Sequence, residues 1–321
     1  MNASSKRSES TRASSFVKRV RKGETAKITP QFRGCMSSFD AHGVALYYEE
    51  RGSGDPVVLV HGTLNDYAVW KSQTDALSSE FKTITYSRRY AYPNERQGDL
   101  TDSTVQNNAE DLTALVDGPG GGKVHLIGHS YGGYISAYFA LNHPEKLRSL
   151  TLVNAFVATM LARTTSTSAM LSLLFRSPRA AMSARRTLNA TAATVKAVEG
   201  GDQTAAMRIF MPALLDGRND LPPKPAEFEQ IVNRNARTLR ETTNPYPPIT
   251  KTEASKIAVP TMVIWGEFSA PWDYKISQML AESIVSSERS VIPGASHLCL
   301  LEKPAYANGK VLEFLRKHRA G

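Results

Sequence analysis

The chain has 321 residues, enough for one large domain with a sizeable core, and its 41% hydrophobic and 21% charged residues are typical of globular proteins. A run of about 18 apolar residues does not occur, so the sequence predicts no transmembrane helix and no stable membrane insertion. The two cysteines, Cys35 and Cys299, offer neither a disulfide framework nor the spacing of metal ligands. We therefore expect a reducing, cytoplasmic setting.

The net charge of +9 lies mostly near the N-terminus, where residues 1–33 hold nine basic and two acidic side chains among many serines. A basic segment with few apolar residues cannot bury enough surface to fold, so we expect residues 1–35 to form a disordered tail. A targeting segment or a weak anchor to an anionic surface is the alternative, and the lack of an apolar h-region argues against an export signal. The nearly neutral remainder gives no reason to expect a nucleic-acid partner.

Strands and helices alternate from about Met36 onward. A hairpin opens the series, with strands at 38–40 and 44–49 around a turn at 41–43. Continuous apolar runs then predict strands that are buried on both faces, and apolar residues at helical spacing predict the helices between them. These strands are 56–60, 82–87, 123–127 and 147–153, and the helices are 67–77, 104–116 and a segment that ends near 142. Because parallel strands need crossover connections, the pattern predicts an α/β fold with a mostly parallel, doubly wound sheet.

The alternation stops after Asn154 for about a hundred residues. Residues 155–256 show helical patterning with few β-branched runs, which predicts a helical cap inserted into the sheet domain. Strands at 261–265 and 289–292 and helices at 274–284 and 304–319 then complete the series. The expected organisation is therefore a tail, a core in two parts and a cap, with bounds 1–35, 36–154, 155–256 and 257–321.

The segment Gly128-His129-Ser130-Tyr131-Gly132 matches G-x-S-x-G and stands between a predicted buried strand and a predicted helix. Glycines on both sides permit a turn that is too tight for residues with a Cβ, and this turn exposes the Ser130 hydroxyl at the carboxyl edge of the sheet. The amide of Tyr131, in the first turn of the helix, is then directed at a developing oxyanion. This setting favours Ser130 as a nucleophile over a chance turn.

A serine hydroxyl needs a base within hydrogen-bond reach, and seven histidines are candidates. His297 follows the last predicted strand, where a loop at the carboxyl edge can return it to Ser130. His61 and His129 flank glycines at tight turns, which favours structural roles. Packing or surface exposure explains the other four, which are His42, His125, His143 and His318.

Three motifs together resemble the α/β-hydrolase superfamily, from about Met36 to the C-terminus: H-G at 61–62, G-H-S-Y-G-G at 128–133 and G-A-S-H at 294–297. The resemblance implies an esterase or lipase-like enzyme of the serine branch, without cofactor or metal. The turn at 61–63 suits a second oxyanion donor, the amide of Thr63, beside that of Tyr131. Epoxide hydrolases and haloalkane dehalogenases of the superfamily carry aspartate where this chain has Ser130, so those activities are not expected.

The acid of a Ser-His-acid triad usually follows the strand after the cap in this family, and Ser269 stands at that place. A carboxylate is required because it fixes the tautomer of the histidine and stabilises the imidazolium. Glu267, two residues earlier, is the preferred candidate because its longer side chain can offset a shifted backbone. Asp273, four residues later, is the second candidate, with helix capping as its plain alternative. A missing acid is the third possibility.

The cap offers apolar side chains for a substrate pocket, although most of them must hold its own helices together. Its basic stretch at Arg176, Arg179, Arg185 and Arg186 is better explained as a solvated helix face than as an anion site. The apolar candidates are Met160, Leu161, Met170, Leu171, Leu173, Leu174, Phe175, Met207, Ile209, Phe210, Met211, Leu214 and Leu215.

These features favour a serine hydrolase that cleaves small to medium apolar carboxylic esters, with a small-molecule ester as its partner. Ser130 attacks, His297 transfers the proton and Glu267 orients the imidazole. The amides of Thr63 and Tyr131 hold the oxyanion. A carbon–carbon bond hydrolase or a haloperoxidase-like perhydrolase would use the same residues, and a non-catalytic binding protein on the same fold is the alternative from another class.

Overall fold

The computed structural model describes residues 37–94, 96, 98–160 and 177–319. The predicted tail at 1–35 lies outside the described residues. The same is true of part of the predicted cap, including Arg176 and the apolar candidates at 161, 170, 171 and 173–175.

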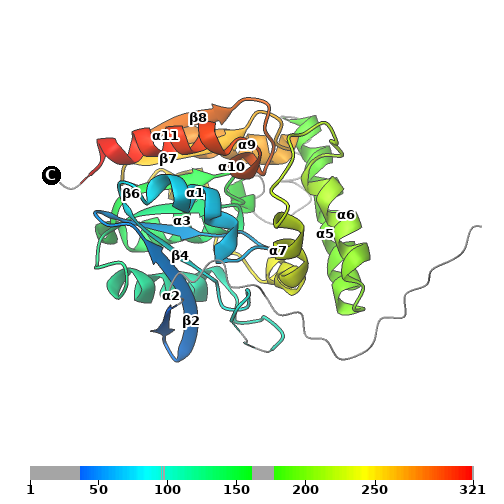
Figure 1. Ribbon diagram of the computed structural model, residues 1–321. Helices are drawn as coiled ribbons and strands as arrows, with labels where there is room; N and C mark the ends of the chain where they lie inside the picture. The colour runs from blue at the N-terminus through cyan, green and yellow to red at the C-terminus, as the bar shows by residue number, and fades with distance from the viewer. Residues whose placement is uncertain (1–36, 95, 97, 161–176, 320–321) are drawn as a thin grey trace, which may run out of the picture. The chain divides into compact units, whose positions relative to one another are not determined.

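Eight strands form one sheet in the order β1-β2-β4-β3-β5-β6-β7-β8 (Figure 1). The first two strands form an antiparallel hairpin, β2 also pairs antiparallel with β4, and every other pair is parallel. This arrangement confirms the predicted α/β class. The strands are β1 Ser37–Ala41, β2 Val44–Arg51, β3 Pro56–Val60, β4 Lys82–Tyr86, β5 Val124–His129, β6 Leu147–Val153, β7 Thr261–Gly266 and β8 Ser287–Ile292.

Alternate residues of the central strands enter two different cores, one on each face of the sheet. Val58 and Leu126 pack with helices α2 (Val105–Asp117), α3 (Tyr131–Asn142) and α9 (Pro271–Ser283). Val57 and Ile127 pack on the opposite face with α1 (Lys71–Leu77), α10 (Cys299–Glu302) and α11 (Pro304–Lys317). Both faces are thus covered, which is why these strands read as continuous apolar runs.

The helices differ from the predicted ones at several places, and the start of α9 matters for the site. Helix α9 begins at Pro271, three residues before the predicted start, because proline suits the first position of a helix. The short helix α10 follows the loop after β8 and was not predicted.

The predicted helix at 67–77 is divided into the 3-10 turn η1 (Tyr67–Trp70) and α1, and a further 3-10 turn, η2 (Pro144–Lys146), precedes β6.

The described residues between β6 and β7 form helices and connecting loops, and α5 and α6 pack side by side (Figure 1). The helices of this insertion are η3 Ala158–Met160, α5 Pro178–Glu199, α6 Gln203–Leu214, α7 Phe228–Arg234, η4 Ala236–Thr243 and α8 Lys251–Ala254. Helix α5 also packs on α9, so the insertion is held to the sheet domain. A helix long and apolar enough to cross a bilayer is absent from the described part of the chain.

Candidate active site

Ser130 lies at the tight turn between β5 and α3, as the G-x-S-x-G pattern predicts. Its backbone is strained, with φ +54° and ψ −119°, a conformation that residues with a side chain rarely adopt. A Cβ on Gly132 would lie 2.2 Å from the carbonyl oxygen of Val60, and a Cβ on Gly128 would lie 2.6 Å from that of Gly132. The strand and helix can approach this closely only because both positions are glycine.

His297 lies in the loop between β8 and α10 and is 2% exposed. Its Nδ1 is 2.8 Å from Oδ2 of Asp273, which is fully buried in the first turn of α9. An Nδ1–H that donates to this carboxylate leaves Nε2 as the basic nitrogen of the ring. Asp273 does not cap α9, whose N-cap is Ala270.

Glu267, the preferred candidate for the acid, does not contact His297 in the structure. Its side chain is exposed, and its Oε2 accepts a hydrogen bond from the amide of Gly294 at 2.8 Å. The early start of α9 is the physical reason, because it moves Asp273 into a helical turn that faces the interior. The structure therefore brings the second candidate, and not the first, to the histidine.

Ser269 and Asn154 complete the surroundings of Asp273. Nδ2 of Asn154, at the end of β6, donates to Oδ2 of Asp273 at 2.7 Å and to Oγ of Ser269 at 2.8 Å. The thiol of Cys299 donates to Oδ1 of Asn154 at 3.4 Å, and burial raises the pKa of this thiol. Ser269 thus occupies the place where the family usually carries the acid, and the side-chain amide of Asn154 joins it to the carboxylate of Asp273. Sequence reasoning missed Asn154, although its place directly after a buried strand was the available signal.

Ser130 and His297 line one cavity of about 40 Å³. Thr63 and Asn65 line it from the loop after β3, and apolar side chains supply most of the remaining wall. Those apolar residues are Leu64, Phe210, Met211, Leu214, Phe228, Val232 and Leu298. Three of them, on α6, belong to the predicted apolar set of the insertion. Arg179, Arg185 and Arg186 are instead exposed, as a solvated helix face requires.

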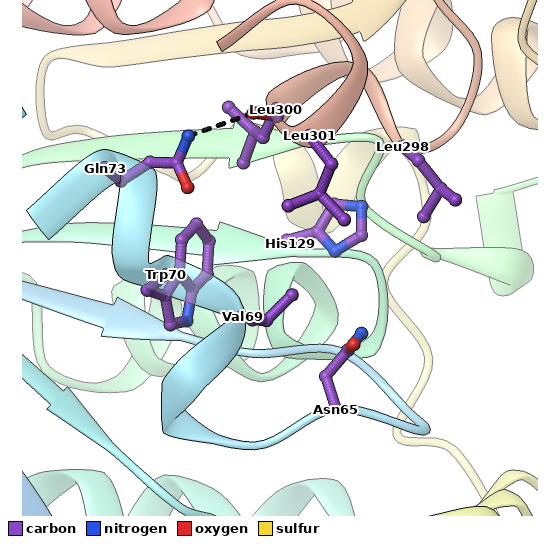
Figure 2. A pocket seen from close by; sticks show the side chains of 8 residues that line it. All are labelled: Asn65, Val69, Trp70, Gln73, His129, Leu298, Leu300 and Leu301. Carbon is purple, nitrogen blue, oxygen red and sulfur yellow. Dashed lines mark hydrogen bonds between the residues drawn. The ribbon is translucent and has the colours of Figure 1, made fainter. Parts of the chain in front are cut away.

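A smaller cavity of about 10 Å³ shares Asn65, His129 and Leu298 with the first one (Figure 2). Gln73 lines it as well and donates to the carbonyl of Leu300 at 3.1 Å, the dashed line in Figure 2. Burial lowers the pKa of His129 to about 3, so its ring is neutral and donates through Nε2 to the carbonyl of His297 at 3.0 Å. His129 therefore supports the loop that carries His297.

The turn at His61, Gly62 and Thr63 adjoins Ser130. A Cβ on Gly62 would lie 2.9 Å from the Cβ of Ser130. Among the described residues, the amide of Thr63 has no hydrogen-bond partner, and the amide of Tyr131 is at the first position of α3, where intrahelical acceptors are lacking. Two amide donors are thus available near Ser130.

A buried ion pair between Arg88 and Glu241 contacts this turn. Sequence reasoning missed it. Oε1 of Glu241 is 2.6 Å from the guanidinium, and the two side chains are 2% and 1% exposed. Burial alone would lower the pKa of Arg88, but the carboxylate of Glu241 raises it above its ordinary value, so Arg88 remains charged. A local signal was lacking, because 153 residues separate the partners.

Comparison with known proteins places the chain in a family. The profile described as "alpha/beta hydrolase fold" matches residues 55–304. A protein from Azorhizobium caulinodans, provisionally named carbamate hydrolase RutD, is 34% identical over 118 residues, which are 36% of this chain and 44% of the relative. A soluble epoxide hydrolase from a Corynebacterium species is 30% identical over 113 residues, 35% of this chain and 39% of the relative. The chain thus spans less than half the length of these curated relatives.

A solved structure gives a longer match. A thermophilic esterase from Thermogutta terrifontis superposes with a TM-score of 0.67 at 26% identity, over 89% of this chain and 98% of the esterase. This match covers most of the chain and so is not confined to the segments matched by the curated relatives. Together with the family profile, which covers most of the sequence, it shows that the protein belongs to the alpha/beta hydrolase fold family.

Proposed function

We propose that this protein is a serine hydrolase that cleaves small, apolar carboxylic esters through an acyl-enzyme on Ser130. The observation that carries the proposal is the shared cavity of Ser130 and His297, with Nδ1 of His297 held by Asp273 at 2.8 Å. A nucleophile, a base and an acid that orients the base are the parts that acyl transfer to serine requires. In this proposal Asp273 replaces Glu267 as the acid of the triad.

In the acylation step, Oγ of Ser130 forms a bond to the ester carbonyl carbon while its proton passes to Nε2 of His297. Asp273 stabilises the resulting imidazolium. The negative charge on the carbonyl oxygen is held by the amides of Thr63 and Tyr131. When the tetrahedral intermediate collapses, the bond to the alkoxy oxygen breaks, and His297 returns the proton to the departing alcohol.

In the deacylation step, His297 removes a proton from water, and the hydroxyl oxygen attacks the acyl-enzyme. The same two amides hold the second oxyanion. Collapse breaks the bond between the carbonyl carbon and Oγ of Ser130, which takes the proton back from His297, and the carboxylic acid is released. This sequence of steps needs no metal or cofactor.

We also propose that residues 155–256 act as a cap that selects the substrate. Phe210, Met211 and Leu214 of α6 and Phe228 and Val232 of α7 line the same cavity as Ser130. An apolar wall favours an apolar acyl or alcohol group, and the small volume favours a short one. A small-molecule substrate is therefore expected.

Labelling with a fluorophosphonate probe, together with turnover of short nitrophenyl esters, tests the proposal. The full chain should be labelled and should release nitrophenol, and Ser130→Ala should do neither while keeping the thermal midpoint of the parent. Absence of labelling in the intact folded protein would overturn the proposal and favour a ligand-binding role.

Identification of the products separates the related activities that use the same residues. Ester hydrolysis yields an acid and an alcohol, cleavage beside a ketone yields two carbon fragments, and perhydrolysis yields a peracid. A phenyl carbamate should be included, because one group of relatives is named for carbamate hydrolysis. An epoxide should not turn over, since Ser130 stands where the epoxide-opening members of the superfamily carry aspartate.

A further inference from the structure

The peptide unit between Gly62 and Thr63 has a fixed direction in this structure. It is trans, because the cis bond among the described residues is Tyr92–Pro93, so its carbonyl and its N–H point in opposite directions. The carbonyl of Gly62 accepts from the guanidinium of Arg88 at 3.2 Å and lies 2.8 Å from Nδ1 of His61. The N–H of Thr63 therefore points away from Arg88, and Thr63 lines the cavity of Ser130.

Arg88 contacts the turn at His61 and Gly62 and the ring of Tyr131. Its Nε donates to the carbonyl of His61 at 3.0 Å, and its backbone amide donates to Nε2 of His61 at 3.0 Å. Its guanidinium also lies 4.9 Å from the ring centroid of Tyr131. A buried positive charge on a peptide carbonyl polarises that peptide and makes its N–H a stronger donor.

Glu241 of η4 holds Arg88 in this position. Its two oxygens accept from the guanidinium at 2.6 and 2.8 Å, and Ser103 donates to it at 3.0 Å. Oγ1 of Thr63 donates to the same carboxylate at 3.1 Å. Glu241 thus fixes the turn twice, through Arg88 at the carbonyls and directly at the side chain of Thr63.

We propose that Arg88 and Glu241 are positioning residues that direct and polarise the Gly62–Thr63 peptide as one donor of the oxyanion hole. This inference rests on the proposed function. Because Glu241 belongs to the insertion, the insertion contributes to transition-state stabilisation in addition to lining the cavity. Removal of one partner leaves a buried, unpaired charge, so the turn loses its fixed geometry.

The test compares Glu241→Gln with Asp111→Asn. Asp111 forms a second buried ion pair with the neighbouring Arg89 at 2.7 Å, and in the described part of the chain its side-chain hydrogen bonds go to Arg89 and not to the oxyanion turn. We expect Glu241→Gln to lower kcat for nitrophenyl acetate by about 10- to 100-fold with little change in KM, because an oxyanion donor acts in the transition state. Asp111→Asn should keep kcat within about threefold of the wild-type value. This should hold even if its thermal midpoint falls as far as that of Glu241→Gln.

An aryl trifluoromethyl ketone gives a second measurement, because it adds to the serine as an anionic tetrahedral adduct. Its inhibition constant should rise in Glu241→Gln in proportion to the loss in kcat. Thr63→Val removes only the hydrogen bond from Oγ1 to Glu241. It should lower kcat and raise the inhibition constant in the same proportion but by less, and it replaces Glu241→Gln as the test if that variant does not fold.

The outcomes are distinguishable. Equal relative losses of kcat in Glu241→Gln and Asp111→Asn would overturn the positioning role, because general destabilisation would then explain both. A wild-type value of kcat in Glu241→Gln or, if that variant does not fold, in Thr63→Val would overturn it as well. Absence of turnover and of labelling in the wild-type protein would overturn the proposed function and this inference together.

Discussion

Oδ2 of Asp273 lies 2.8 Å from Nδ1 of His297, and both side chains are buried. The same carboxylate oxygen accepts from Nδ2 of Asn154 at 2.7 Å, so two donors converge on it. Oδ1 of Asp273 is buried without a hydrogen-bond partner among the described residues. The position of the carboxylate therefore depends on these two contacts, and each of them leads to a prediction.

Asp273→Asn should lower kcat for nitrophenyl esters by about four orders of magnitude, because an amide stabilises the wrong tautomer of His297 and cannot stabilise the imidazolium. Steady-state kinetics on the purified variant measure this loss. Glu267→Gln is the matched control, since Glu267 bonds to the amide of Gly294 and not to the histidine. It should keep kcat within a few-fold. The reverse ranking of the two variants would return the acid to Glu267.

Asn154→Ala should lower kcat by about 10- to 100-fold, as expected for loss of a hydrogen bond to a charged group worth roughly 1.5–3 kcal/mol. The reason is that Oδ2 of Asp273 would keep a single donor and could rotate away from His297. Ser269→Ala is the control, because its hydroxyl bonds to Asn154 and not to Asp273. A loss in Ser269→Ala as large as that in Asn154→Ala would show that the serine, rather than the amide, fixes the site.

Local patterns were sufficient to predict most of the sheet and the tight turn that carries Ser130. The strands at 56–60 and 147–153 have the predicted bounds because both of their faces are covered, which leaves a continuous apolar run in the sequence. The turn at Ser130 was predictable because it requires glycines at fixed offsets on both sides. In these cases the physical constraint is local, so the sequence alone reveals it.

The contacts of Asp273 with His297 and Asn154 could not be predicted from local patterns. Which carboxylate reaches His297 depends on where α9 begins, and the start at Pro271 turns Asp273 inward while Glu267 remains outside. The contact between Arg88 and Glu241 joins a loop after β4 to the insertion, and neither segment carries a periodic signal for it. Tertiary packing decides both features.

Phe210→Ala should shift the preference of the enzyme toward longer acyl chains. Phe210 on α6 lines the cavity of Ser130, and removal of its ring enlarges a space of about 40 Å³. Each additional buried methylene contributes about 0.8 kcal/mol, which corresponds to roughly fourfold in kcat/KM. The measurement is the ratio of kcat/KM for nitrophenyl butyrate to that for the acetate. Leu188→Ala, on the exposed side of α5, should leave the ratio unchanged. A constant ratio in Phe210→Ala would argue against substrate binding beside α6.

The buried His125 on β5 makes stability depend on pH. Burial lowers the pKa of His125 to about 4, while in the unfolded chain a histidine titrates near 6.5. Between these values the unfolded chain binds a proton that the folded protein does not, so the free energy of unfolding falls as the pH decreases from 6.5 toward 4. Above pH 6.5 both states are neutral, and this contribution is constant. One such group gives a slope of about 1.4 kcal/mol per pH unit within the window.

His125→Asn isolates the contribution of this titration, because it removes the titrating ring and its amide can still reach Ser149. Oγ of Ser149 lies 2.8 Å from Nδ1 of the histidine. Urea unfolding at pH 4.5, 5.25 and 6 should show a slope that is lower than that of the wild type by about 1.4 kcal/mol per pH unit. Ser149→Ala removes the hydrogen bond but keeps the titrating ring, so it should be less stable at every pH with an unchanged slope. If His125→Asn kept the wild-type slope, the ring of His125 would bind its proton equally in the folded and unfolded states. That result would contradict the inference that His125 is neutral in the folded protein.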